Sequence, residues 1–226
     1  FTCIEDVIWA LMAQFRALVR VAYVFKNADM SLYAREGSCS LVSSFYSNCR
    51  QVQRDIFNGG VAPYGAHVTS VCGVPNVVDS LAAIQQVVFD RKQADMSRLL
   101  AALNTDFQQD LQLLHLLEQA PKFGNDQDEV DHFAVELLDL CSEHLCAHTT
   151  VNQMRSASGC IGMTVNIPFG KIVGALPDGR RAGQPLSEGG ISPYQGRNTN
   201  GMTATMRSVA KIHHSNILNG SILNIR

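Results

Sequence analysis

The chain has 226 residues, of which 46% are hydrophobic and 17% charged, and its formal net charge is −2. This length allows one large domain or two small ones, and the low charge indicates a globular protein whose surface is partly covered by more protein. The charge excludes the basic surface of nucleic-acid-binding proteins, and Arg16, Arg20 and Lys26 interrupt the most apolar segment, so we expect neither nucleic acid nor membrane as a partner.

The first quarter of the chain predicts helices. Apolar residues recur with helical spacing over residues 1–25, and a second helix is predicted over residues 39–57. Asn58-Gly59-Gly60 is typical of a helix C-cap and ends this second helix. Residues 61–76, rich in small and β-branched side chains, favour a short strand or a buried loop.

The middle of the chain predicts further helices. One is expected from Val77 to Asp90 with Asn76 as its N-cap, and another over residues 97–119 with Ser97 as its cap. A third begins after Asn125 or Asp126, either of which can cap it. We expect these helices to lie between short strands.

An acidic cluster opens the third of these helices. Asp128, Glu129 and Asp131 occupy its first turns, where the helix dipole favours negative charge. A metal site is the alternative, but the cluster lacks the spacing, central Gly and distal Glu of a calcium loop. The sequence therefore favours a capped helix terminus and predicts no metal.

The last third of the chain combines a predicted strand, a long loop and a short helix. "GMTVNIPFG" (162–170) has strand character, "GALPDGRRAGQPLSEGGISPYQG" (174–196) is rich in turn residues, and a last strand is expected at Ile222–Ile225. Long helices between few short strands predict an α/β fold with parallel strands and helical crossovers. We expect a fragment of a longer protein, since the chain opens in a helical pattern without Met and closes within a strand pattern.

Three isolated motifs are weak. "PDGRRAG" (177–183) lacks the spacing of a phosphate loop, so its two arginines are expected to bind loop carbonyls. His213 and His214 cannot face one point on a regular element. The cysteines are irregularly spaced and are predicted to be buried reduced thiols of a cytoplasmic protein: Cys3, Cys39, Cys49, Cys72, Cys141, Cys146 and Cys160.

Four stretches together carry a resemblance to a known family. They are "NGGVAPYGAHVTSVCGVPNVVDSLAAI" (58–84), "APKFGNDQDEVD" (120–131), "TVNIPFGKIVGALPDGRRAGQPLSEGGISPYQG" (164–196) and "NGMTATMRSVAKIHHSNILNGSILN" (200–224). In order and spacing they resemble the pyruvate formate-lyase-like glycyl radical enzymes. The resemblance covers nearly the whole chain and is weakest over residues 1–38.

The resemblance implies a ten-stranded α/β barrel of two antiparallel five-stranded halves, with two finger loops meeting inside it. One finger carries a catalytic cysteine and the other a glycine that stores an organic radical. The radical passes from the glycine to the cysteine, and the thiyl radical formed there acts on a small polar substrate. A separate S-adenosylmethionine iron–sulfur activating enzyme installs the glycyl radical, and the barrel binds no cofactor itself. A homodimer in anaerobic metabolism is expected.

The chain departs from the family at both decisive points. The family's cysteine finger precedes the segment that matches residues 1–25, and its radical glycine follows the segment that matches the last residues, so we expect no catalytic residue in this chain. Cys160, in "GCIG", stands in the wrong place in the family's order. We expect an incomplete, partial barrel domain over residues 1–226, helical over 1–57, with a barrel core over 58–226 that includes a turn-rich loop at 171–197.

Four residues are candidates for the substrate pocket. On a strand, Thr164, Asn166 and Pro168 share one face, and the apolar neighbours share the other. The family's corresponding strand contributes pocket side chains, so we expect the first face to line the pocket, with His67 nearby in a loop. The alternatives are that Asn166 is a satisfied buried amide and His67 a core histidine. Asp178 and Arg180 are expected to hold the long loop, which packs against other protein.

Three functions remain open. The first is a glycyl radical lyase or dehydratase, or a formate acetyltransferase-like enzyme, in which this chain alone is inactive. The second is a truncated or split paralogue that serves as a structural or interaction subunit. The third is a nucleotide-binding α/β module that uses "PDGRRAG". Neither the substrate nor the bond that is cleaved follows from this sequence.

Overall fold

The computed structural model describes residues 1–62, 66–162 and 164–225. It contains helices, two strands and short helical turns, in this order: α1 (Ile4–Glu36), α2 (Ser40–Phe45), α3 (Ser47–Val52), η1 (Ile56–Asn58), β1 (Ala66–Ser70), α4 (Val74–Ile84), η2 (Gln85–Asp90, π-helical), α5 (Met96–Asn104), α6 (Leu111–Gln119), α7 (Asp128–Cys146), β2 (Arg155–Gly159), α8 (Asn166–Ile172), α9 (Gly201–Ala210) and η3 (His214–Asn216).

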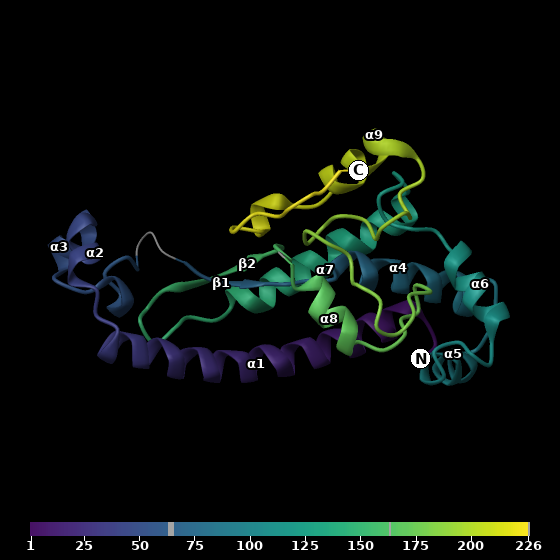
Figure 1. The fold of residues 1–226 in the computed structure, drawn as a ribbon, viewed down its shortest axis with the longest axis horizontal. Coiled ribbons are helices and arrows are strands. Elements are labelled where there is room, and N and C mark those ends of the chain that lie inside the picture. The colour runs from purple at the N-terminus through teal and green to yellow at the C-terminus, as the bar shows by residue number, and fades with distance from the viewer. Residues whose placement is uncertain (63–65, 163, 226) are drawn as a thin grey trace.

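Helix α1 runs along most of the long axis of the molecule (Figure 1). It ends at the small helices α2 and α3, while α5 and α6 lie near its other end. Helix α7 and the two strands lie between α1 and the C-terminal segment that carries α9. The strands are therefore covered by helices on one side and by irregular chain on the other.

Strands β1 and β2 form a parallel pair, in register from Ala66 opposite Arg155 to Ser70 opposite Gly159. Helices α4 to α7 form the crossover between them, which confirms the predicted parallel strands with helical connections. The predicted strand at Ile222–Ile225 is wrong: single bridges join Ser221 to Cys160 and Ile222 to Gly190. This short stretch lies beside Cys160, the residue that follows β2, and forms no strand of its own.

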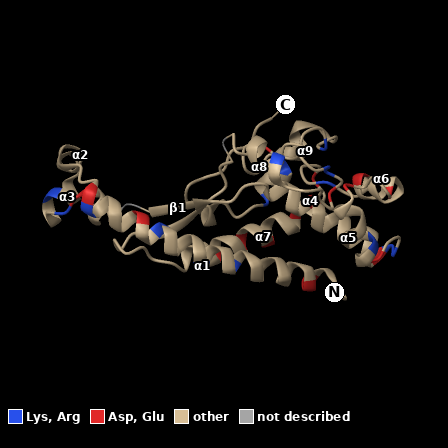
Figure 2. Cartoon of the chain, turned by 60° about the horizontal axis from the view of Figure 1, so that its bottom comes forward, with Lys and Arg blue, Asp and Glu red and all other residues tan. Residues whose placement is uncertain are grey.

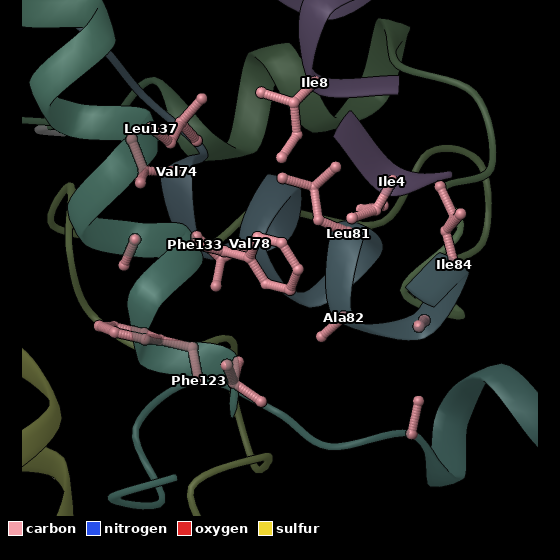
Figure 3. Close-up of a cluster of buried hydrophobic side chains, with 14 of the residues drawn as sticks. Ile4, Ile8, Val74, Val78, Leu81, Ala82, Ile84, Phe123, Phe133 and Leu137 are labelled. Atoms are coloured by element: carbon pink, nitrogen blue, oxygen red, sulfur yellow. The ribbon is translucent and has the colours of Figure 1, made fainter. Parts of the chain in front are cut away.

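The hydrophobic core lies where α1, α4 and α7 meet (Figure 3). Ile4 and Ile8 of α1 face Val78 and Leu81 of α4, and Phe133 of α7 closes the cluster. Helix α4 is buried along almost all of its length, so the apolar run over residues 74–84 is a core helix.

The predicted helices differ from the observed ones mainly at their ends. Helix α1 continues past residue 25 to Glu36, because no Gly or Pro interrupts it before Gly37. The single helix predicted over 39–57 is broken at Tyr46, whose backbone is extended. Gly59, at φ 81°, ends η1 in the left-handed region, as the Gly-Gly signal indicated.

The predicted helix over 97–119 is two helices, α5 and α6. Asp95 and Asp110 cap them, in place of the predicted Ser97, by accepting the N–H groups of Arg98 and Leu113. Between the helices, Phe107 adopts φ 59° and is fully buried. Burial of its ring offsets the cost of a left-handed backbone, so tertiary packing overrides helix propensity here.

Helix α1 alters the expectation about membranes. By length and composition alone it is long and apolar enough to cross one, although Arg16, Arg20 and Lys26 were expected to prevent this. These three cations are too few to exclude α1 as a membrane-spanning helix by composition. One stripe of α1 packs in the core through Ile4, Ile8 and Met12, which is the behaviour of a core helix.

Candidate functional site

The segment predicted to be the pocket strand is a turn and a helix. Thr164 and Val165 form a turn, and α8 begins at Asn166. Pro168 lies in the first turn of this helix, where a missing N–H costs nothing. The expected alternation of polar and apolar faces is therefore wrong, and Met163 lies outside the described residues.

The three candidates on this segment are not equivalent. Asn166 is buried, and its amide nitrogen donates to the Leu186 carbonyl at 3.4 Å. The backbone carbonyl of Asn166 accepts a hydrogen bond from the Leu186 N–H at 3.0 Å. Thr164 and Pro168 are exposed, and Ile167 is 50% exposed instead of packed on helices. The structure thus separates Asn166 from Thr164 and Pro168 by burial.

His67 lies on a strand instead of in the predicted loop. It belongs to β1 and pairs with Ser156 of β2. Its side chain is half-buried, and this burial, together with the charge of Lys26, lowers its pKa. His67 is therefore held in its neutral form near pH 7, with a ring that can donate and accept one hydrogen bond each.

The turn-rich loop is built around one arginine. Arg180 is fully buried, and its guanidinium donates to the carbonyls of Gly170 at 2.6 Å, Gly174 at 2.8 Å and Pro185 at 3.2 Å, and also to that of Gln184. This confirms that the arginine fixes the loop through carbonyls. Because its donors face these carbonyls, Arg180 is not available to a phosphate, which disfavours the nucleotide-binding alternative.

Asn76 of α4 binds the turn-rich loop through two side-chain hydrogen bonds. It is not the predicted N-cap, because α4 already begins at Val74, after Gly73 at φ 75°. The buried Asn76 amide donates to Asp178 Oδ2 at 2.8 Å, and its oxygen accepts the Ser187 N–H at 2.7 Å. No local pattern reveals this role, because both partners lie more than 100 residues along the chain.

Three buried charges and the partly exposed Arg197 lie together where α4, the loop after α6 and the long loop meet. Arg197 Nη1 lies 3.2 Å from Asp178 Oδ2 and 3.6 Å from Asp79 Oδ2. Lys122 is 6% exposed and donates to the Leu117 carbonyl at 2.6 Å. We name Asp79, Lys122, Asp178 and Arg197 the buried charge cluster. It is formally neutral, as a cluster removed from water must be.

Burial shifts the pKa values of two members of this cluster toward their neutral forms. It raises the pKa of Asp79 to about 7, against the opposing pull of Lys122 and of a hydrogen bond from the Phe123 N–H at 2.7 Å. It lowers the pKa of Lys122 to about 8, although Asp79 opposes this. Asp79 Oδ2 and Arg197 Nη1 lack a hydrogen bond within the described chain.

The acidic cluster at the start of α7 holds a lysine. Lys211 Nζ lies 3.0 Å from Asp126, 2.6 Å from Asp128 and 2.7 Å from Asp131.

Gln127 stands at the N-cap of α7 and makes no side-chain cap bond, so the predicted cap by Asn125 or Asp126 is wrong. Asn125 binds backbone groups of Lys122, Arg197 and Asn200 instead. Among the described residues, no group of three or more His, Cys, Asp or Glu side chains could hold a metal.

The cysteines are free thiols, as predicted, but the prediction that all of them are buried is wrong: Cys146 is exposed, and Cys3, Cys39 and Cys72 are partly exposed. Cys160 is fully buried in the core, and burial raises its pKa to about 12. Cys141, on α7, has its pKa raised to about 12 for the same reason. A thiol with so high a pKa remains protonated at neutral pH, so Cys160 is a core residue and no thiolate nucleophile.

Comparison with known proteins explains the fold. A family model described as pyruvate formate lyase-like matches residues 1–170. The chain belongs to this family. Trans-4-hydroxy-L-proline dehydratase of Clostridioides difficile is 33% identical over 227 residues, which cover 100% of this chain and 28% of the relative. Isethionate sulfite-lyase of Bilophila wadsworthia is 30% identical and covers 90% of this chain and 25% of the relative.

Solved structures agree with the family assignment. The hydroxyproline dehydratase of Clostridioides difficile, with trans-4-hydroxy-L-proline bound, matches at a TM-score of 0.95 and 32% identity over 99% of this chain. The B12-independent glycerol dehydratase of Clostridium butyricum matches at a TM-score of 0.93 and 32% identity over 99% of this chain. The pyruvate formate lyase-like chain spans 28% of each of these structures.

Proposed function

We propose that the intact protein carrying this chain is a glycyl radical dehydratase or lyase that acts on a small polar substrate. The observation that carries this proposal is the match of 99% of the chain, at a TM-score of 0.95, to a hydroxyproline dehydratase. Other relatives are named for glycerol, 1,2-propanediol and isethionate, all of them small and polar. The substrate of this protein is expected to be of the same class.

In this proposal the chain forms one part of the barrel, which is incomplete without the rest of the polypeptide. The rest of the polypeptide also supplies the radical glycine and the finger cysteine. The burial of Cys160 in the hydrophobic core supports a catalytic thiol from elsewhere. The parallel pair β1–β2 and its helical crossover would form one part of the barrel wall. This chain alone would then be inactive.

We propose that the substrate lies near residues 164–168 and β1. Asn166 presents a buried amide there, and His67 presents a half-buried imidazole whose lowered pKa keeps it neutral. Both can hydrogen-bond hydroxyl or carboxylate groups without carrying a charge of their own. Thr164 and Pro168, exposed in this chain, would be covered by the rest of the barrel or by substrate.

The partners of the intact protein follow from the same proposal. A separate S-adenosylmethionine iron–sulfur enzyme would install the glycyl radical in the cytoplasm of an anaerobe, and the active form would be a homodimer. The second candidate, an inactive paralogue that serves as an interaction subunit, is favoured by the broad apolar surface of α1.

The test is anaerobic activation of the intact protein with a cognate activating enzyme and S-adenosylmethionine. We expect a glycyl radical doublet in electron paramagnetic resonance, and turnover of hydroxyproline, glycerol, 1,2-propanediol or isethionate. The isolated 226-residue chain, as the matched control, should give no such signal. An intact protein that forms no radical would support the interaction subunit, and a doublet from the isolated chain would refute the division of roles.

A further inference from the structure

Helix α8 cannot hold its position by its own stability or by side-chain packing. It has seven residues, fewer than an isolated helix needs in water. Ile167, Phe169 and Ile172 are 50%, 46% and 81% exposed. Backbone contacts must therefore fix it. Leu186 supplies one of them, at the Asn166 carbonyl.

Arg180 supplies the contacts at the other end of α8. The last carbonyls of a helix have no partner within it, and a cation there is favoured by the helix dipole. The Arg180 guanidinium donates from Nη2 to the Gly170 carbonyl at 2.6 Å and from Nη1 to the Gly174 carbonyl at 2.8 Å. From Nε it donates to the Pro185 carbonyl at 3.2 Å. One side chain thus joins the end of α8 to residues 184–185.

The two backbone segments that Arg180 joins are in direct contact. A Cβ atom built on Gly170 would lie 2.3 Å from the Gln184 carbonyl oxygen and 2.7 Å from Pro185 Cα. No side chain fits between them, so the position of α8 relative to residues 184–187 depends on this contact. Only a planar group with several fixed donors can serve both segments at once.

We infer that Arg180 is a positioning residue: by fixing α8 on residues 184–187 it places Asn166 for substrate binding. This inference rests on the proposed function. Arg180 touches no substrate in this account and acts through the α8 backbone. Arg181, its neighbour, donates to the Asp106 carbonyl at 3.1 Å and makes no contact with α8 among the described residues, so it offers a matched control.

The experiment compares Arg180→Lys and Arg181→Lys in the intact, activated protein. Lysine keeps the charge but cannot donate to both segments, so Arg180→Lys should raise KM about tenfold and change kcat per glycyl radical less than threefold. Hydrogen exchange at the Val173 and Leu186 amides should become about tenfold faster. Arg181→Lys should leave both measurements within twofold of wild type.

Gly170→Ala is the second variant, in case Arg180→Lys does not fold. It pushes α8 away from the Gln184 carbonyl without changing the guanidinium, and should raise KM in the same way. Unchanged exchange in folded Arg180→Lys, or faster exchange with unchanged KM, would overturn the inference. If the wild type forms a radical but turns over none of the four substrates, the proposed function fails, and the exchange rates alone decide whether Arg180 anchors α8.

Discussion

At the scale of single residues, the buried charge cluster is the main departure from an ordinary core. Asp79 and Asp178 are completely buried, and Lys122 nearly so. Removing one partner of such a cluster leaves an uncompensated buried charge, which costs more than the intact cluster contributes. The cluster joins three segments far apart in the sequence, so it fixes their arrangement as well as adding stability.

Asp79 should make the stability of the protein depend on pH. Its pKa is about 7 in the folded state and near 3.8 when unfolded, so between these values the folded state retains a proton that the unfolded state has released. The stabilisation is complete below the unfolded pKa and is lost as pH rises through about 7, by up to about 1.4 kcal/mol per pH unit. Lys122, whose pKa is about 8, stays charged in both states below pH 7.

The measurement is urea unfolding of the intact protein at pH 5, 6 and 7. Asp79→Asn should remove most of the fall in unfolding free energy over this range, because the amide does not titrate. Asp95→Asn, at the exposed cap of α5, is the control and should keep the wild-type slope. Equal slopes in Asp79→Asn and wild type would show that Asp79 is ionised when folded.

At the scale of elements, the long loop behaves as a rigid structure. Arg180 and Asn76 bind its backbone from inside, and Gly190 lets it approach the end of β2. A loop with so many buried backbone groups needs these partners, since an unpaired buried group costs about 1–3 kcal/mol. Gly179, Gly189 and Gly190 therefore serve close packing, whereas nothing lies within 4 Å of a Cβ atom built on the other glycines of the loop, Gly174, Gly183 and Gly196.

Gly190→Ala should disrupt the contact between this loop and β2. A Cβ atom at this position would lie 1.8 Å from the Cys160 carbonyl oxygen, and the backbone φ of +126° is strained for any other residue. We expect a loss of more than about 3 kcal/mol, or failure to fold.

Gly183→Ala is the matched control. Gly183 also has a positive φ, of +77°, but nothing lies within 4 Å of an added Cβ. This variant should cost only the backbone strain, about 1 kcal/mol. Soluble yield and urea midpoints of the intact protein measure both variants, and equal losses would mean that the contact with Cys160 is not decisive.

At the scale of the whole molecule, helix α1 exposes a second apolar face. Leu18, Val21, Val24 and Phe25 are each more than half exposed, and much of the helix carries no charge (Figure 2). A patch of this kind marks a surface covered by protein or lipid. The chain spans about a quarter of its solved relatives, so we expect protein from the remaining length to cover this face.

Phe25→Glu in the intact protein tests this expectation. If protein covers Phe25, an unpaired charge there should lower the unfolding free energy by more than about 2 kcal/mol. Arg20→Glu, at an exposed position of the same helix, should change it by less than about 0.5 kcal/mol. Stability unchanged by Phe25→Glu, together with co-sedimentation of the intact protein with phospholipid vesicles, would show that lipid covers the face instead.

Local patterns determined the α/β class, the parallel strands with helical crossovers, the free state of the thiols and the carbonyl-binding role of Arg180. These follow from hydrophobic period, turn residues and side-chain donors, which act over a few residues. The resemblance to the family followed from four motifs that occur in the order and spacing typical of the family. In contrast, the strand predicted over 162–170 is helical after Asn166, although its β-branched residues favoured a strand.

Only the tertiary structure decided the break at Phe107, the partners of Asn76 and the buried charge cluster. Each depends on segments far apart in the sequence: Asn76 meets Ser187, Asp79 meets Arg197, and Phe107 enters the core from a left-handed backbone. Burial energies of a few kcal/mol exceed local propensities of a few tenths, so packing overrides the local pattern wherever the two conflict. The sequence alone therefore determined the fold class and most of the helices, and the packed structure decided where the helices end, which segments form strands and which side chains meet.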